Sequence, residues 1–457
     1  MSRRRLLIGA VAAGVVAGAL YALSPLTVIC IPLVVAMCAW VARELPPDER
    51  RWFVALMVLA VVSRLLAIAV LFLSASDARP FEVLFGDELF FKNRSLWLRN
   101  IGLRVPISPA DVIYAYEDVG VSSYLYVLAL LQALVGKAPY GIHVFNSACY
   151  ITGVVLLFRF VRAAYGSISA FAGLAVLLFL PSLFMWSISA IKEPLYTLVA
   201  ALELVCALQA ARAVQWSARL RWLAGVIVGT VALESVRRGA GIVPIVGVGA
   251  GYFFGYVVPR PKWLLATVAL LPPVVVAALS IPAIHEPILS ALRTGAFYHS
   301  GHVLSPGYSY LALRGDYYRD GLTIFTMPVN DVIQYVIRCY VAYVTEPVPW
   351  RIESRAMLAY LPEQVFWLLL LALVVIGIHR GIRRDAMLTT LLLAHAFAGA
   401  SIVAVSSGNI GTLVRHRGLI FPYIAWLAGL GLYQIVHLAV RRGSARSIGG
   451  LHAHGYS

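Results

Sequence analysis

The chain has 457 residues, of which 61% are hydrophobic and only 13% are charged, and its mean hydropathy is +0.84. This composition excludes a soluble domain of the same length, because such a domain needs a mostly polar surface. Apolar runs of roughly 17–22 residues recur along the chain, and that is the length of a helix that crosses a bilayer. The sequence therefore predicts an all-α, polytopic membrane protein.

The net charge of +16 does not predict a nucleic-acid partner. Most basic residues stand next to apolar runs, where anionic lipid headgroups and the positive-inside rule account for them. The five cysteines show no CxxC spacing, so no disulfide framework is predicted. The expected surroundings of the protein are membrane lipids.

Hydropathy predicts about twelve transmembrane helices in a single domain, residues 1–457, and the first helix is expected to be retained rather than cleaved. With the N-terminus inside, the basic clusters fall on one side, which predicts a multi-pass protein of the inner (plasma) membrane with both termini in the cytoplasm. The expected spans are 6–22, 26–43, 53–74, 143–162, 167–185, 194–213, 222–236, 240–258, 264–283, 364–379, 386–406 and 418–437.

Two long segments then lie outside the cell, residues 75–141 and 283–362. Each contains a short apolar stretch, YLYVLALLQALVG in the first and VIQYVIRCYVAYV in the second. The first stretch is too short to span, and Arg338 in the middle of the second costs roughly 2.5–3.5 kcal/mol on insertion scales. Both are therefore expected to be interfacial or re-entrant helices, and residues 329–346 are expected to lie along the interface rather than to span.

The stretch FGDELFFKNRSLWLRN opens with two adjacent carboxylates, Asp87 and Glu88. A helix from Glu88 places one apolar arc opposite one polar arc, which predicts an amphipathic helix in the interface plane. Asp87 is then either an N-cap or a base that takes a proton from an acceptor hydroxyl, and one residue can do both. The apolar arc holds Leu89, Phe90, Leu96, Trp97 and Ile101, and the polar arc holds Glu88, Lys92, Ser95 and Arg99.

This opening, followed by HVFNSACYITGVVLLFRFVRAAYG and LPSLFMWSISAIKEPLYTLVAALEL, resembles the GT-C superfamily, and within it the family-39-like enzymes. These are integral-membrane glycosyltransferases that use polyprenyl-phosphate-linked sugars. The resemblance implies that Asp87 takes the position of the catalytic acid, with Glu88 as its neighbour, and that Lys192 lies in the small, polar and basic stretch after a helix. The later TEPVPWRIESRAMLAYLPEQVFW and RHRGLIFPYIAWLAG look like relatives associated with surface-polysaccharide assembly.

The sequence departs from that family in two ways. Two helices precede the one that carries the acidic loop, where many members have one. EDVGVSSYLY stands where a Pro-rich stretch is common, so either Asp87-Glu88 or Glu117-Asp118 is the operative pair. We favour Asp87-Glu88, because it directly follows a span.

Basic residues at the outer ends of spans are the candidates for binding phosphate, because the planar guanidinium of Arg suits a phosphate group. The ordinary alternative is that these cations pair with headgroups or nearby acids. His299 and His302 have too weak a spacing to indicate a metal, so no cofactor is required and a divalent metal is not indicated. The candidates at span ends are Arg237, Arg238, Arg415, His416 and Arg417.

The predicted function is a membrane glycosyltransferase of cell-envelope polysaccharide biosynthesis. It would transfer a sugar, with inversion, from a polyprenyl-phosphate donor to a glycan, lipid or protein acceptor on the outer face. The first alternative is a surface-polysaccharide polymerase or ligase that uses lipid-pyrophosphate donors and a large outer loop. The second is a lipid or oligosaccharide transporter. It is disfavoured because few acidic residues lie within the spans and no paired proton relay is obvious; Arg64 and Glu234 are the notable ionisable residues there.

Overall fold

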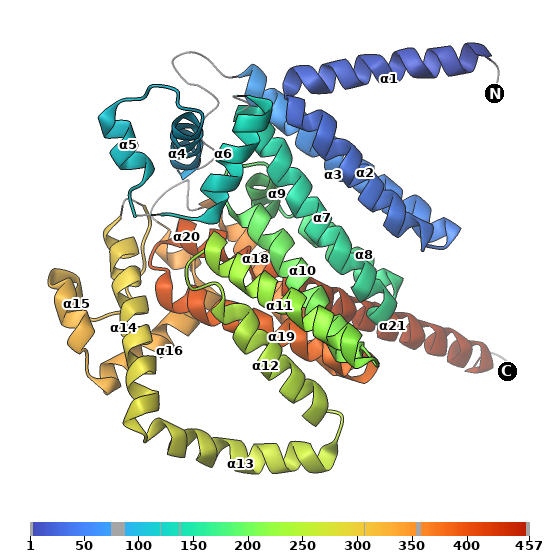
Figure 1. Cartoon of the computed structure of the whole chain (residues 1–457). Coiled ribbons are helices and arrows are strands. Elements are labelled where there is room, and N and C mark those ends of the chain that lie inside the picture. Colours follow the sequence, from blue (N-terminus) through green and yellow to red (C-terminus); the bar gives the residue numbers. More distant parts are fainter. Residues whose placement is uncertain are drawn as a thin grey trace. The chain divides into compact units, whose positions relative to one another are not determined.

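The computed structural model describes residues 3–74, 87–118, 120–136, 139–305, 307–352 and 358–453, and these residues are largely helical (Figure 1). Part of the first expected outer segment, residues 75–86, lies outside them. The longer helices are α1 (Arg3–Leu23), α2 (Pro25–Arg43), α3 (Pro47–Leu73), α4 (Asp87–Gly102), α6 (Ser123–Val135), α7 (Pro139–Tyr165), α8 (Ser167–Phe179), α10 (Glu193–Arg212), α11 (Trp216–Val236), α12 (Ile242–Val257), α13 (Pro261–Leu279), α14 (Pro282–Leu304), α16 (Val329–Thr345), α18 (Leu361–Arg384), α19 (Ala386–Ser406) and α21 (Phe421–Ala453). The short ones are α5 (Pro109–Ala115), α9 (Pro181–Ser187), α15 (Gly315–Arg319), η1 (Gly321–Thr326), η2 (Pro349–Arg351) and α20 (Ile410–Arg417).

Among the described residues, eight helices are long and apolar enough to cross a membrane, or nine if the bent pair α8 and α9 is one span. This confirms a polytopic helical membrane protein. The prediction of twelve spans also included α1, α11 and α12, which do not meet the same criteria. The 16 residues of α12 rise only about 24 Å, which is less than the roughly 30 Å of a hydrocarbon core. The apolar stretch described in α1 is limited to Leu7–Ala19.

The expected span 167–185 is not one continuous helix. The helix breaks between α8 and α9, whose axes differ by 62°. The cause is Pro181, because a proline pushes the residue before it out of the helical region, and Leu180 has φ −58° and ψ 125°.

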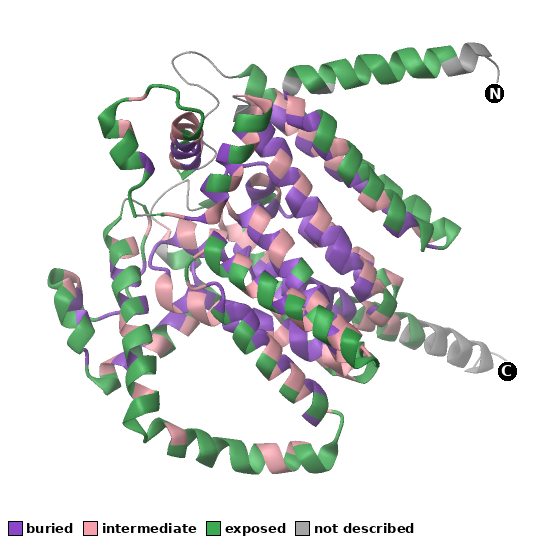
Figure 2. Cartoon of the chain, in the orientation of Figure 1, coloured by how far each residue is buried: buried purple, intermediate pink, exposed green. Residues whose placement is uncertain are grey.

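The chain divides into two compact units. Unit 1 comprises Met1–Phe160, Leu174–Ala207 and Leu220–Gly241, and unit 2 comprises Val161–Gly173, Leu208–Arg219 and Ile242–Ser457. Part of the core of unit 1 is formed by Leu26 and Cys30 of α2, Ile68 of α3 and Val144 of α7. In Figure 2, α7 is largely coloured as buried.

In unit 2, the helices α12 and α19 pack closely because one face of α12 carries glycines at every fourth position. A Cβ at Gly247 would meet the His395 ring at 2.6 Å, and one at Gly251 would meet the Leu391 side chain at 2.7 Å. Small residues at this spacing let two helix backbones approach, which is a common way for membrane helices to associate. The apolar helix α13 has no buried residue, as Figure 2 also shows, so its side chains suit contact with lipid.

Candidate functional site

The acidic pair lies at the first turn of α4, which begins at Asp87. Asp87 is exposed, whereas Glu88 is 1% exposed. The positive end of the helix dipole favours both negative charges at this place. Two adjacent carboxylates therefore have opposite environments, one open to the surroundings and one enclosed by protein.

The predicted helix of the opening stretch is present, but the expectation for its polar arc is wrong. Glu88 and Ser95 from that arc are buried, together with Phe91, Arg94 and Leu98, whereas Leu89 from the apolar arc is exposed. The polar face of a helix beside a membrane can face either water or protein. Here it packs against the protein, where other polar groups form hydrogen bonds with its side chains. The Ser95 hydroxyl, for example, accepts a hydrogen bond from Gln132 of α6 at 2.7 Å.

The Glu88 carboxylate binds the turn between α9 and α10. Its Oε2 accepts a hydrogen bond from the backbone N–H of Ala190 at 3.0 Å. The Nδ1 atom of His143 lies 3.8 Å from the same oxygen, which is too long for a hydrogen bond. His143 Nδ1 instead donates to the Ile188 carbonyl at 2.6 Å, so the ring is held beside the carboxylate.

A face of α7 holds the same turn. Asn146 Nδ2 donates to the carbonyls of Ser189 at 2.5 Å and Ile191 at 2.8 Å. Ser147 Oγ donates to the Ser187 carbonyl at 3.0 Å. His143, Asn146 and Ser147 are spaced i, i+3 and i+4, so they share one side of the helix. Non-helical backbone among apolar spans needs such partners, because no water is available there to satisfy it.

Arg64 of α3 forms hydrogen bonds with residues on both sides of the break between α8 and α9. The side chain is 1% exposed. Its Nε donates to Ser187 Oγ at 2.8 Å and its Nη2 to the Leu178 carbonyl at 2.9 Å. This ionisable residue within a span therefore binds the backbone around a helix break.

Two of the predicted cations belong to this region. Lys192 ends the turn, and its Nζ lies 5.9 Å from the centre of the Phe91 ring. Phe91 is one helical turn after Asp87, so the ammonium group is close to the first turn of α4. Arg237 Nη1 lies 3.9 Å from an oxygen of Glu193, the residue that follows Lys192.

The remaining predicted residues of unit 1 lie elsewhere. Arg238 pairs with Asp118 at 2.8 Å, and both side chains are largely exposed. The backbone of Glu117, the other acid of the alternative pair, accepts a hydrogen bond from Arg94. The alternative pair Glu117-Asp118 is thus next to a cation but is not enclosed as Glu88 is.

The prediction that Arg417 binds donor phosphate finds no support in unit 2. Arg417 is 3% exposed, and its two Nη groups donate to protein oxygens: Gln364 Oε1 at 2.7 Å, the Glu346 carbonyl at 2.7 Å, and the Tyr343 carbonyl. Burial lowers the pKa of Arg417 to about 10, which still leaves it a cation at neutral pH. Its neighbour His416 is buried as well, and Arg415 is half-buried.

Sequence reasoning missed His143, Asn146, Ser147 and the buried Glu203 of α10. A signal for the first three exists, because HVFNS places three polar residues on one side of an otherwise apolar helix. Within the part of the chain that the structure describes, no three His, Cys, Asp or Glu residues gather as a metal site would require. Comparison with protein-family models, with curated proteins and with solved structures finds no match for this chain.

Proposed function

We propose that the protein is an inverting membrane glycosyltransferase of the GT-C type that uses a polyprenyl-phosphate sugar donor. The observation that carries the proposal is the contrast between the two carboxylates at the first turn of α4. Glu88 is buried and bonded to Ala190, whereas Asp87 is exposed on a backbone that this bond holds in place. An accessible carboxylate on a fixed helix end suits a general base.

In the proposed reaction, an acceptor hydroxyl oxygen attacks the anomeric carbon of the sugar and its proton passes to Asp87. The bond between the sugar and the lipid phosphate breaks, and its electron pair leaves with the phosphate. Lys192 and Arg237 are the cations we assign to this leaving group, because charge builds on the phosphate as the bond breaks. A single displacement inverts the anomeric carbon.

The polymerase or ligase alternative relies on Arg and His in the second outer segment, and two of its arginines, Arg293 and Arg314, have protein partners. Arg293 donates twice to the Met327 carbonyl, at 3.1 and 2.7 Å. Arg314 lies 3.4 Å from Asp316 and 3.6 Å from Asp331. We therefore rank this alternative second.

The transporter alternative gains one observation, because broken spans often line transport sites. The break between α8 and α9 is, however, bound by Arg64 and Ser147, whose hydrogen bonds leave its backbone well satisfied. We rank it third.

The test is transfer of a radiolabelled sugar from a defined polyprenyl-phosphate donor by the purified full-length protein. Asp87→Asn keeps the side-chain shape and removes the negative charge, so it should lower turnover by about 10²–10⁴-fold through loss of the base. Asp118→Asn is the matched comparison, since it removes an exposed carboxylate of the alternative pair.

Three outcomes are informative. Loss of transfer in Asp87→Asn alone supports the proposal, and loss in Asp118→Asn alone moves the base to the alternative pair. Absence of transfer with every polyprenyl-phosphate sugar tested, combined with transfer from lipid-pyrophosphate donors, would favour the polymerase or ligase. Lipid-linked sugar moving across proteoliposomes without any transfer would favour the transporter.

A further inference from the structure

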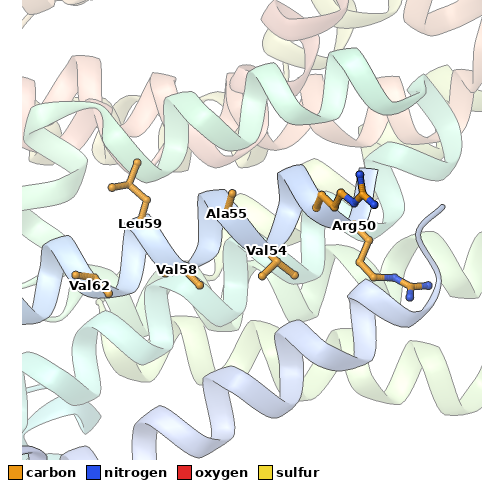
Figure 3. A pocket seen from close by; sticks show the side chains of 7 residues that line it. Arg50, Val54, Ala55, Val58, Leu59 and Val62 are labelled. Atoms are coloured by element: carbon orange, nitrogen blue, oxygen red, sulfur yellow. The ribbon is translucent and has the colours of Figure 1, made fainter. Parts of the chain in front are cut away.

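A shallow, largely open groove of about 730 Å³ runs along the exposed side of α3, within unit 1 (Figure 3). Its walls are apolar side chains, and one of its ends carries two adjacent arginines. Val54, Val58 and Val62 are between 45 and 56% exposed, so the described residues leave this face open. A face of this kind on a membrane-crossing helix calls for an apolar occupant.

The charged end of the groove is formed by Arg50 and Arg51. Arg50 Nε donates to the Ala42 carbonyl at 3.0 Å and its Nη2 to the Leu45 carbonyl at 3.1 Å, which fixes the guanidinium at the end of α2. Arg51 is exposed and has neither a hydrogen bond nor an ion pair with any described residue. The carboxylates of Asp48 and Glu49 lie in the same turn, but neither pairs with Arg51. One cation is thus anchored and the other is available to an anion.

The apolar part of the groove is a strip of side chains along one side of α3. Val54, Val58 and Val62 follow one another at four-residue intervals and so extend for about 12 Å along the helix axis. Ala55 is the smallest of the side chains that line the groove (Figure 3). Trp52 is 71% exposed beside the arginines, and exposed tryptophans at span ends are typical of the headgroup level.

We infer that this groove binds one anionic phospholipid, with its phosphodiester on Arg50 and Arg51 and one acyl chain along Val54, Val58 and Val62. Charge selects the headgroup, because two neighbouring cations favour a net negative lipid over a zwitterionic one. The apolar walls bind the chain, because the chain covers exposed valines that would otherwise contact disordered lipid. The site is independent of the proposed transferase reaction.

The experiment measures lipid binding to the purified full-length protein by native mass spectrometry, with phosphatidylglycerol and phosphatidylcholine of identical acyl chains. We expect phosphatidylglycerol to bind more tightly. Arg51→Gln should lower its affinity by about fivefold, the usual effect of one surface cation on an anionic lipid, and leave phosphatidylcholine unchanged. Ala55→Phe fills the groove and should weaken both lipids.

Two matched controls keep the test specific. Arg319→Gln removes an exposed arginine of unit 2, and Leu33→Phe enlarges an exposed residue of α2 outside the groove. Both should behave as the wild type. Equal binding of the two lipids, or an Arg51→Gln affinity that matches Arg319→Gln, would overturn the inference. So would competition by soluble glycerophosphate at the same strength as the lipid, which indicates a plain anion site. A change of oligomeric state in Ala55→Phe would instead assign the groove to a second copy of the chain.

Discussion

The Glu88 carboxylate accepts a hydrogen bond from the backbone N–H of Ala190, a residue 102 positions later in the chain. This bond joins the first turn of α4 to the turn between α9 and α10. Asp87 precedes Glu88 and Lys192 follows Ala190 by two residues, so the same bond brings an exposed carboxylate and a cation into one region of unit 1. In the proposed reaction, the two acidic residues therefore have separate roles: Glu88 positions the first turn of α4, and Asp87 is the base.

Glu88→Gln and Glu88→Ala distinguish positioning from chemistry. Gln keeps an oxygen that can accept from Ala190, so Glu88→Gln should stay close to wild-type stability and retain more transfer activity than Asp87→Asn. Glu88→Ala leaves the buried N–H without its acceptor and should lose about 1–3 kcal/mol of stability. Melting temperature and turnover, measured on the same preparations, check both statements. A Glu88→Gln protein as inactive as Asp87→Asn would contradict the division of roles.

Asn146 should be required for stability because its amide donates to two carbonyls of the turn. Asn146→Asp has the same shape but cannot donate, and it adds a buried negative charge beside the carbonyl oxygens of Ser189 and Ile191. We expect a loss of about 2 kcal/mol or more. The control is Asn93→Asp on the exposed side of α4. Thermal unfolding of the two variants at the same midpoint would show that Asn146 does not hold the turn.

Hydropathy was sufficient to predict the helical class and the position of α4, because both depend on local periodicity and length. The direction in which α4 faces was not predictable in this way. An amphipathic pattern separates two faces but does not say whether the polar face meets water or protein, and the partners of Glu88 and Ser95 come from distant segments. The HVFNS pattern on α7 is the local evidence that a polar interior exists.

The break at Leu180 and Pro181 shows a different limit. Proline within an apolar run indicates either a kinked span or a broken one, and the sequence does not choose between them. What stabilises the break is a set of side chains from other helices, among them Arg64 and Ser147. Arg417 illustrates the same point, since a cation at a span end suits phosphate by its position and binds Gln364 and backbone carbonyls in the fold.

The topology we propose places Asp87 and Arg415 outside the cell and Arg383 in the cytoplasm. Single cysteines at 87 and 383, in a chain whose five native cysteines have been replaced, should react oppositely with a membrane-impermeant reagent on intact cells. Position 87 should be labelled at once and position 383 only after the membrane is opened. The reverse labelling pattern would mean that the protein has the opposite orientation, and it would rule out a reaction at Asp87 on the outer face.

Close packing of α18 against α21 predicts opposite effects for two Gly→Ala substitutions in unit 2. A Cβ at Gly431 would overlap the Leu373 carbonyl of α18, so Gly431→Ala should destabilise by about 1–3 kcal/mol. At Gly249 in α12, a Cβ has no heavy atom within 4 Å, so Gly249→Ala should be neutral or stabilise by up to about 1 kcal/mol. A Gly431→Ala protein that melts no lower than Gly249→Ala would contradict the packing of α18 and α21.

The last prediction concerns His299 of α14, a buried imidazole that both its hydrogen bonds define as neutral. The hydroxyl of Tyr318 accepts from the backbone N–H groups of Ala312 and Leu313, so its own proton points to His299 Nε2 at 3.1 Å. The Nδ1–H of the ring donates to the Ser407 carbonyl at 2.5 Å. Tyr310, Tyr335 and His302 are the other titratable groups around it.

Burial lowers the pKa of His299 to about 4 from its ordinary value of 6.5. Between these two values the unfolded chain binds a proton that the folded protein does not, so stability must fall as the pH falls from about 6.5 to about 4. The loss from this group should reach about 3 kcal/mol. His299→Gln lacks the titration, so the difference in melting temperature between wild type and variant should shrink over that interval. If the difference in melting temperature stays constant from pH 7 to pH 4, His299 is protonated equally in the folded and unfolded chains. That result would contradict a neutral imidazole held by these two hydrogen bonds.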